Sequence, residues 1–172
     1  MKTIEERARA IKLVCTDVDG VLTTGALQYG DDPRHNKMFN VRDGAGIKWL
    51  QRHKVPVAFI SGLDSPATIH RAWDLKVEDC FVGHLVKGPV LDQLCAKYGL
   101  RPEEVAHVGD DLADLPLLNR VGLACCPHDA VAEVKERCHW VVPVNGGYGV
   151  LRAVAEAILK AQGHWDEVVG SY

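Results

Sequence analysis

The 172-residue chain has no long apolar run, no strong net charge and no paired cysteine motif. An apolar run of transmembrane length is missing, so no membrane span is expected. The charged segment at residues 1–12 lacks the apolar centre of a signal peptide, and we therefore expect a cytoplasmic protein. The formal net charge of −3 provides no basic surface for nucleic acid, and an anionic substrate must be bound by local cations.

The six cysteines are scattered along the chain, and no two of them form a CxxC motif. We therefore expect reduced thiols, and neither a disulfide framework nor a zinc site. The eight histidines show no metal-ligand spacing either. We interpret them as surface or loop residues, with His107 in a strand.

Short apolar runs alternate with amphipathic segments along the chain, and no repeat, low-complexity stretch or linker separates them. This alternation predicts a Rossmann-like three-layer α/β fold, with a parallel sheet between helices, in one domain over residues 1–172. The expected strands lie at about residues 12–16, 57–60, 80–82, 105–108, 121–124 and 140–142. The expected helices lie at about residues 43–54, 65–74, 89–98, 112–119, 129–136 and 149–162.

Residues 21–42 interrupt this alternation, because residues 27–29 and 37–41 flank a polar turn at residues 30–34. The pattern predicts a protruding β-hairpin in place of a cap domain, too small to fold by itself. Its exposed edges favour contact with another copy of the chain. The tail at about residues 163–172 is expected either to be a disordered end or to form a lid over an adjacent site. Its apolar side chains favour docking.

Three expected strands end abruptly in polar residues, which are Asp17-Val18-Asp19-Gly20, Ser61-Gly62 and Gly109-Asp110-Asp111. The C-terminal ends of parallel strands form the ligand crevice of an open sheet, so these polar ends should meet in space. A single aspartate is more readily interpreted as a turn residue or a cap, as Asp111 would be for the helix at 112–119. The set, with Asp114 added, would repel itself without a cation, and magnesium fits such oxygen ligands best.

The two carboxylates of Asp17 and Asp19 follow a strand directly and lie two positions apart. One can attack phosphorus while the other moves a proton. Gly20 allows a tight turn that brings backbone N–H groups close to a phosphate. An EF-hand calcium loop is excluded, because no glutamate follows at its twelfth position. Lys87, at a helix start, opposes the helix dipole, which a nearby anion such as phosphate would explain. Taken by itself, a solvated loop lysine is the alternative.

The order and spacing of these motifs resemble the four-motif set of haloacid dehalogenase-type phosphatases over nearly the whole chain. The motifs are Asp17-x-Asp19-Gly20, Ser61-Gly62, Lys87 and Gly109-Asp110-Asp111-x-x-Asp114. The small size and the expected hairpin resemble the capless subclass. Within it, four segments are similar to the 3-deoxy-D-manno-octulosonate 8-phosphate phosphatases, at residues 39–44, 109–112, 146–149 and 161–166.

The resemblance implies an aspartyl-phosphate on Asp17, with Asp19 protonating the leaving oxygen and then activating water. Ser61 and Lys87 would bind the phosphoryl oxygens. Magnesium (Mg2+) would be held by Asp17, the Asp19 carbonyl and Asp110, with Asp111 or Asp114 in support. The implied substrate contacts are Gly20, Asn40, Val41, Arg42, Asp43, Gly44, Lys48, Gly62, Arg71 and Lys87. The family acts in lipopolysaccharide sugar synthesis as a homotetramer, in which a neighbouring chain completes each active site.

Three positions depart from that family's pattern. Lys48 replaces an arginine and loses its bidentate fork, and Leu63 and Tyr148 stand where two further arginines are expected. Two cations near the sugar carboxylate are therefore missing, and an unpaired carboxylate is costly. The alternatives are a nine-carbon sugar acid phosphate, phenyl phosphate, or a role as a delta-type subunit of a phenylphosphate carboxylase complex. A non-catalytic binding subunit is less favoured, because the principal motif residues are all present.

Overall fold

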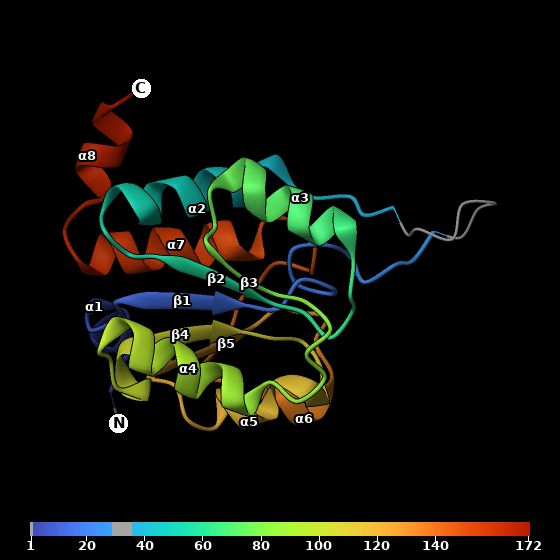
Figure 1. The fold of residues 1–172 in the computed structure, drawn as a ribbon. Helices are drawn as coiled ribbons and strands as arrows, with labels where there is room; N and C mark the ends of the chain where they lie inside the picture. Colours follow the sequence, from blue (N-terminus) through green and yellow to red (C-terminus); the bar gives the residue numbers. More distant parts are fainter. Residues whose placement is uncertain (1, 29–35) are drawn as a thin grey trace.

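The computed structural model describes residues 2–28 and 36–172. A six-stranded parallel sheet has the order β3-β2-β1-β4-β5-β6 (Figure 1). The strands are β1 (Leu13–Thr16), β2 (Val57–Ile60), β3 (Asp79–Phe81), β4 (Val105–Val108), β5 (Leu123–Cys126) and β6 (Trp140–Val141). The predicted parallel sheet is confirmed. The strand order changes direction between β1 and β4, which is where an open sheet of this type forms its crevice.

Helices cover both faces of the sheet, as predicted (Figure 1). One face carries α2 (Val41–Arg52), α3 (Pro66–Leu75) and α7 (Val150–Ala161), and α1 (Ile4–Arg9) packs against α7. The other face carries α4 (Gly88–Tyr98), α5 (Leu115–Leu118) and α6 (Ala132–Lys135). No helix in the described part of the chain is long and apolar enough to cross a membrane.

The central strands β1, β2, β4 and β5 are buried along their whole length. Successive side chains of a strand point to opposite faces, so each strand supplies both hydrophobic clusters. In β1, Val14 joins the cluster under α2 and α7, whereas Leu13 and Cys15 join the cluster under α4 and α5. This two-sided burial explains why the strands are nearly continuous apolar runs in the sequence.

Several element boundaries differ from the sequence prediction. Helix α2 starts at Val41 because the Asn40 side chain accepts a hydrogen bond from the Arg42 N–H at 2.9 Å and caps the helix. Strand β5 begins two residues later than predicted. The helix expected at 112–119 is divided into a 3-10 turn, η2 (Leu112–Asp114), and α5, and Asp111 caps η2 as predicted. A second 3-10 turn, η1 (Pro102–Glu104), precedes β4.

The predicted hairpin is only partly visible. Its turn at residues 30–34 lies outside the described residues, and the flanking segments show one isolated antiparallel bridge between Gln28 and Asn36. The strand predicted at 37–41 is wrong, because residues 37–40 have no strand pairing and Val41 belongs to α2. The Lys37 side chain is instead buried beside Asp19.

The tail forms helix α8 (Trp165–Gly170) and folds back onto the same chain near the end of α2 (Figure 1). Trp165 packs edge-on against Trp49, with ring centroids 5.6 Å apart. The Trp49 indole N–H donates a hydrogen bond to the Tyr172 hydroxyl at 3.2 Å, and Val168 is buried. The tail is therefore an ordered helix docked on its own chain and not a disordered end, and a lid over an adjacent site stays a prediction.

Gly122 offers a direct test of packing at the start of β5. A Cβ atom there would lie 1.9 Å from the carbonyl oxygen of Glu103. Gly122→Ala should therefore lower the free energy of unfolding by about 1–3 kcal/mol, measured by urea denaturation, because the backbone must move apart. Gly170→Ala is the matched control, since a Cβ there meets nothing within 4 Å. Equal unfolding midpoints for Gly122→Ala and wild type would contradict this close approach.

Candidate active site

The polar ends of β1, β2 and β4 meet in one open pocket of about 370 Å³. The predicted residues that line it are Asp17, Asp19, Gly62, Lys87, Asp110, Asp111 and Asp114. Leu27, Leu63 and Leu85 line the same pocket. The prediction that three separated polar segments converge at one edge of the sheet is confirmed.

Lys87 is the central cation of this pocket. Its side chain is 3% exposed, and its Nζ lies 2.7 Å from Asp17 Oδ1 and 2.8 Å from Asp114 Oδ1. Burial alone would lower the pKa of Lys87, but the two carboxylates outweigh burial and raise it. A cation is unfavourable at the start of α4 because of the helix dipole. Asp17 and Asp114 supply the negative charge that stabilises Lys87 there.

Asp114 organises the loop that follows β4. Its Oδ1 accepts from Lys87 and lies 2.8 Å from His107 Nε2, while its Oδ2 accepts from the N–H groups of Asp110 and Asp111 at 3.1 and 3.4 Å. Burial would raise the pKa of Asp114, but His107 and Lys87 lower it to about 2. The Asp114 carboxylate is therefore kept ionised and fixed in position by these partners. His107 was predicted only as a strand residue, because no sequence pattern linked it to Asp114.

Two glycines make room for these carboxylates. A Cβ at Gly20 would lie 2.0 Å from Asp110 Oδ2, and the φ of +95° at Gly20 also favours glycine. A Cβ at Gly109 would lie 2.3 Å from the carboxyl carbon of Asp114. Gly20 and Gly109 therefore allow the carboxyl groups of Asp110 and Asp114 to pack closely against the backbone, and Gly20 also allows the tight turn after Asp19.

Asp19 lies at the mouth of the pocket, with its side chain 26% exposed. Its Oδ2 is 2.7 Å from Lys37 Nζ and accepts from the Ser61 hydroxyl at 3.2 Å. The Leu63 N–H donates in turn to Ser61 Oγ at 3.2 Å. Lys37, with its side chain 1% exposed, is a site residue that sequence reasoning missed, because it was assigned to a strand.

The carboxylates fit a hard divalent cation. Asp17, Asp110 and Asp114 each place one oxygen within 4.8 Å of the other two. Burial, together with Asp17 and Asp114, raises the pKa of Asp110 to about 8, and burial followed by Asp114 raises the pKa of Asp17. Asp110 Oδ1 is buried without a hydrogen-bond partner among the described residues. Both Asp114 oxygens are already engaged, so Asp17 and Asp110 are the side chains left to coordinate.

Most of the predicted sugar contacts lie elsewhere in the chain. Asn40, Val41, Arg42, Asp43, Gly44, Lys48 and Arg71 do not line the pocket at Asp17. Four of them, Asn40, Asp43, Gly44 and Arg71, line a narrow hollow with residues of α2 and α3. Within a single chain the structure therefore does not bring this set to the carboxylates at Asp17.

Members of that set make contacts that hold the fold. Arg71 donates to the Asn40 carbonyl at 3.3 Å, and Lys48 donates to the Leu75 carbonyl. The Asp43 carboxylate accepts from the Arg152 N–H at 2.8 Å, and burial raises the pKa of Asp43 to about 6.

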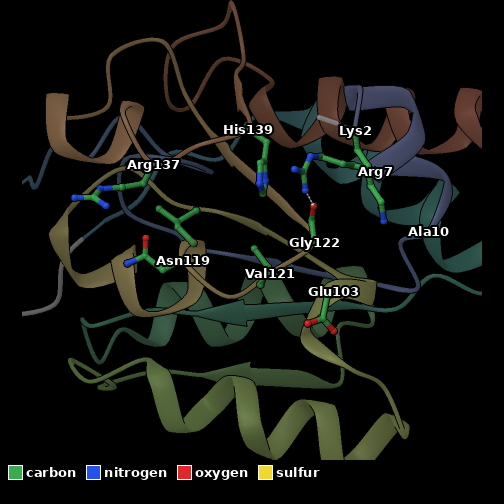
Figure 2. Close-up of a pocket in the computed structure, with 10 residues that line it drawn as sticks. Lys2, Arg7, Ala10, Glu103, Asn119, Val121, Gly122, Arg137 and His139 are labelled. Carbon is green, nitrogen blue, oxygen red and sulfur yellow. Dashed lines mark hydrogen bonds between the residues drawn. The ribbon is translucent and has the colours of Figure 1, made fainter.

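Another pocket, of about 270 Å³, lies at the opposite, N-terminal end of the strands (Figure 2). The Arg7 guanidinium lies beside the His139 ring and donates to the Gly122 carbonyl at 2.8 Å. The acid of this pocket is Glu103, whose carboxylate points away from Arg7 and His139 in Figure 2. This pocket has no carboxylate cluster around a buried lysine, so the pocket at Asp17 is the candidate for phosphoryl chemistry.

Comparison with known proteins is consistent with this site. The sequence profile of the haloacid dehalogenase-like hydrolases matches residues 77–154. The 3-deoxy-D-manno-octulosonate 8-phosphate phosphatase of Haemophilus influenzae is 39% identical over 160 residues, which cover 93% of this chain and 89% of that protein.

Solved structures of similar proteins superpose on almost the whole chain. A probable YrbI family phosphatase from Pseudomonas syringae superposes with a TM-score of 0.96 at 42% identity, covering 98% of this chain and 96% of that one. The 3-deoxy-D-manno-octulosonate 8-phosphate phosphatase of Moraxella catarrhalis, solved with magnesium, phosphate and KDO, gives a TM-score of 0.95 at 31% identity. The match covers 98% of this chain and 97% of that one.

The raised pKa of Asp110 predicts an unusual pH dependence without divalent cations. The folded-state pKa of about 8 exceeds the ordinary value of 3.8, so between these pH values the folded state holds a proton that the unfolded state has released. The free energy of unfolding should therefore fall as the pH rises from about 4 to 8. Urea denaturation in a chelator should show this fall, and Asp110→Asn should reduce it. If the free energy of unfolding changed equally with pH in wild type and in Asp110→Asn, the raised pKa of Asp110 would be contradicted.

Proposed function

The chain belongs to the haloacid dehalogenase-like hydrolases, and we propose that it is a magnesium-dependent phosphatase for 3-deoxy-D-manno-octulosonate 8-phosphate or a similar 2-keto-3-deoxy sugar acid phosphate. The observation that carries this proposal is the buried Lys87, 2.7 Å from Asp17 where the strands end. The relatives from Haemophilus influenzae and Moraxella catarrhalis carry the name of this activity and match nearly the full chain, which supports the same substrate class.

Asp17 is the proposed nucleophile. Lys87 holds its Oδ1 and favours the charged carboxylate, which leaves Oδ2 to attack phosphorus. The bond from phosphorus to the sugar oxygen breaks as the bond to Asp17 forms. In this proposal Lys87, the Ser61 hydroxyl and the backbone at Gly62 and Gly20 bind the other phosphoryl oxygens. Charge stabilisation of this kind supplies most of the catalysis in phosphoryl transfer.

Asp19 is the proposed acid and base. It gives a proton to the leaving sugar oxygen and then takes one from the water that cleaves the aspartyl-phosphate, so each cycle restores both aspartates. Lys37 and Ser61 fix the position of its carboxyl group. Its partial exposure lets water reach it once the sugar has left.

The side chains of Asp17 and Asp110 and the Asp19 carbonyl would hold magnesium. When bound, the ion neutralises the carboxylates and polarises the phosphoryl oxygens. Asp114 supports this arrangement from behind through Lys87 and through the N–H groups of Asp110 and Asp111. Asp111 remains exposed and acts as the cap of η2.

The mouth of the pocket favours a second candidate substrate. Leu27, Leu63 and Leu85 line it, and the side chains of Leu27 and Leu85 are among the exposed large apolar groups of the described residues. Such a mouth suits an apolar leaving group, so phenyl phosphate is the alternative. A sugar acid would instead need cations from outside this pocket, as would a nine-carbon homologue.

Association of several chains would supply the cations that a sugar acid needs. Arg42, Lys48 and Arg71 lie outside the pocket of their own chain, and Arg42 is exposed. We propose a cytoplasmic homotetramer in which these residues, with Asn40 and Val41 beside them, face the active site of a neighbouring chain. No membrane or nucleic-acid partner is expected.

Replacing the nucleophile tests the reaction type. Asp17→Asn should lower kcat by roughly 10⁴-fold or more in a phosphate-release assay with magnesium, because amide nitrogen and oxygen cannot form the intermediate. Asp92→Asn, which alters an ion pair with Arg120 on the surface, is the control and should keep full activity. Wild-type protein that releases no phosphate from a panel of sugar phosphates would refute the proposed function.

Replacing Arg42 tests the source of the missing cations. Arg42→Ala should raise the KM for the eight-carbon sugar acid phosphate by about 10–100-fold, since a charged hydrogen bond is lost, and leave the KM for phenyl phosphate unchanged. Arg52→Ala, at the other end of α2, is the matched control. Light scattering should give the mass of a tetramer. A fully active monomer, or equal KM values for Arg42→Ala and wild type, would contradict the assembly.

A further inference from the structure

Three metal-ligating side chains meet away from the active site, where α8 folds back beside the end of α2 (Figure 1). His53 is the C-terminal cap residue of α2, His164 is the N-terminal cap residue of α8, and Glu167 lies in the first turn of α8. One ligand atom from each side chain lies within 4.8 Å of the other two. No sequence pattern indicates this cluster, because 110 positions separate the two histidines.

The three side chains have ligand atoms to offer. The His53 and His164 rings stack with centroids 4.6 Å apart at an interplanar angle of 22°. Glu167 Oε2 lies 4.0 Å from His53 Nδ1, which is longer than a hydrogen bond. Among the described residues, neither ring makes a side-chain hydrogen bond. Two imidazoles and a carboxylate are therefore gathered together without the hydrogen-bond partners that would otherwise account for their position.

We propose that His53, His164 and Glu167 form a second metal site, selective for zinc or a similar transition-metal ion, that fastens the C-terminal helix to α2. Two histidines and one glutamate are a known ligand set for zinc, with a water in the fourth position. A tetrahedral zinc site at bond lengths of about 2.0–2.2 Å places its ligand atoms about 3.3 Å apart. The cluster reaches that geometry by small side-chain rotations, for which the 76% exposure of Glu167 leaves freedom.

The surroundings can accommodate a metal ion and its water. A hollow of about 100 Å³ lies against His53 and Glu167. Arg52 lines the same hollow, and its positive charge would repel a metal ion. The Arg52 side chain is exposed, so solvent screens this repulsion and the side chain can rotate away from the ion.

The site would act on a short helix with few buried side chains. Helix α8 has six residues, and a helix of that length is unstable without tertiary contacts. Its buried contacts come from Val168 and from Trp165 against Trp49. A metal ion that joins His164 and Glu167 to His53 would link α8 directly to the end of a core helix.

The two proposed metal sites differ in ligand chemistry and can be separated. Magnesium prefers oxygen ligands and is expected at Asp17 and Asp110, whereas imidazole ligands favour zinc and cobalt. A large excess of magnesium should therefore occupy the carboxylate site and leave the histidine site open. The inference is independent of the proposed function, because no residue of the cluster lies in the pocket at Asp17.

Calorimetric titration of the full-length protein with zinc chloride, in excess magnesium, is the test. Wild type should bind one zinc ion per chain. Outer-shell changes already weaken metal sites by about 10–100-fold, so loss of a ligand in His164→Gln or Glu167→Gln should weaken zinc binding at least tenfold. His70→Gln, an exposed histidine on α3, is the matched control and should bind as wild type does. Cobalt should give visible absorption bands of tetrahedral coordination in wild type and in His70→Gln only.

A second readout tests the fastening of α8. Amide hydrogen exchange of residues 165–170 should slow on zinc addition in wild type and in His70→Gln, and stay unchanged in His164→Gln. Phosphatase activity with magnesium should be the same in all four proteins, which shows that each variant is folded. No zinc binding to wild type in excess magnesium, or equal zinc affinity in wild type and His164→Gln, would overturn the proposal.

Discussion

The contact on which the rest of the site depends is the buried ammonium of Lys87 between the carboxylates of Asp17 and Asp114. Burying these charges is costly, and the cost is offset only when each charge has partners with good geometry. His107 and two backbone N–H groups complete the partners of Asp114, so Asp114 stays charged and Lys87 stays in place. Lys87 in turn holds the Asp17 carboxyl group in place just after the end of β1.

The parallel sheet provides this arrangement, because β1, β2 and β4 end at the same edge. The fold also brings the acids closer together than their charges alone would allow. Gly20 and Gly109 leave space into which the carboxyl groups of Asp110 and Asp114 fit. Burial, followed by the neighbouring negative charges, raises the pKa of Asp110, and the same negative charges make the site suitable for a divalent cation.

The sequence was sufficient for the sheet, for the order of its elements and for the convergence of the carboxylates at the strand ends, because apolar periodicity and polar strand ends are local signals. It was insufficient where a side chain acts through a distant partner. Lys37 and His107 reach Asp19 and Asp114 only through tertiary packing. The docking of α8 depends on the contact between Trp165 and Trp49 of α2. In the proposed tetramer the predicted sugar contacts come from a neighbouring chain, which the sequence of one chain does not determine.

The central claim is that Asp17 carries the phosphoryl group between two displacements at phosphorus. The most direct measurement is the stereochemical course of hydrolysis, with an eight-carbon sugar acid phosphate that is chiral at phosphorus through oxygen isotopes and sulfur. Attack by Asp17 followed by attack by water inverts the configuration twice, so the account predicts net retention. Net inversion would show that water attacks the substrate directly, and it would contradict the role assigned to Asp17.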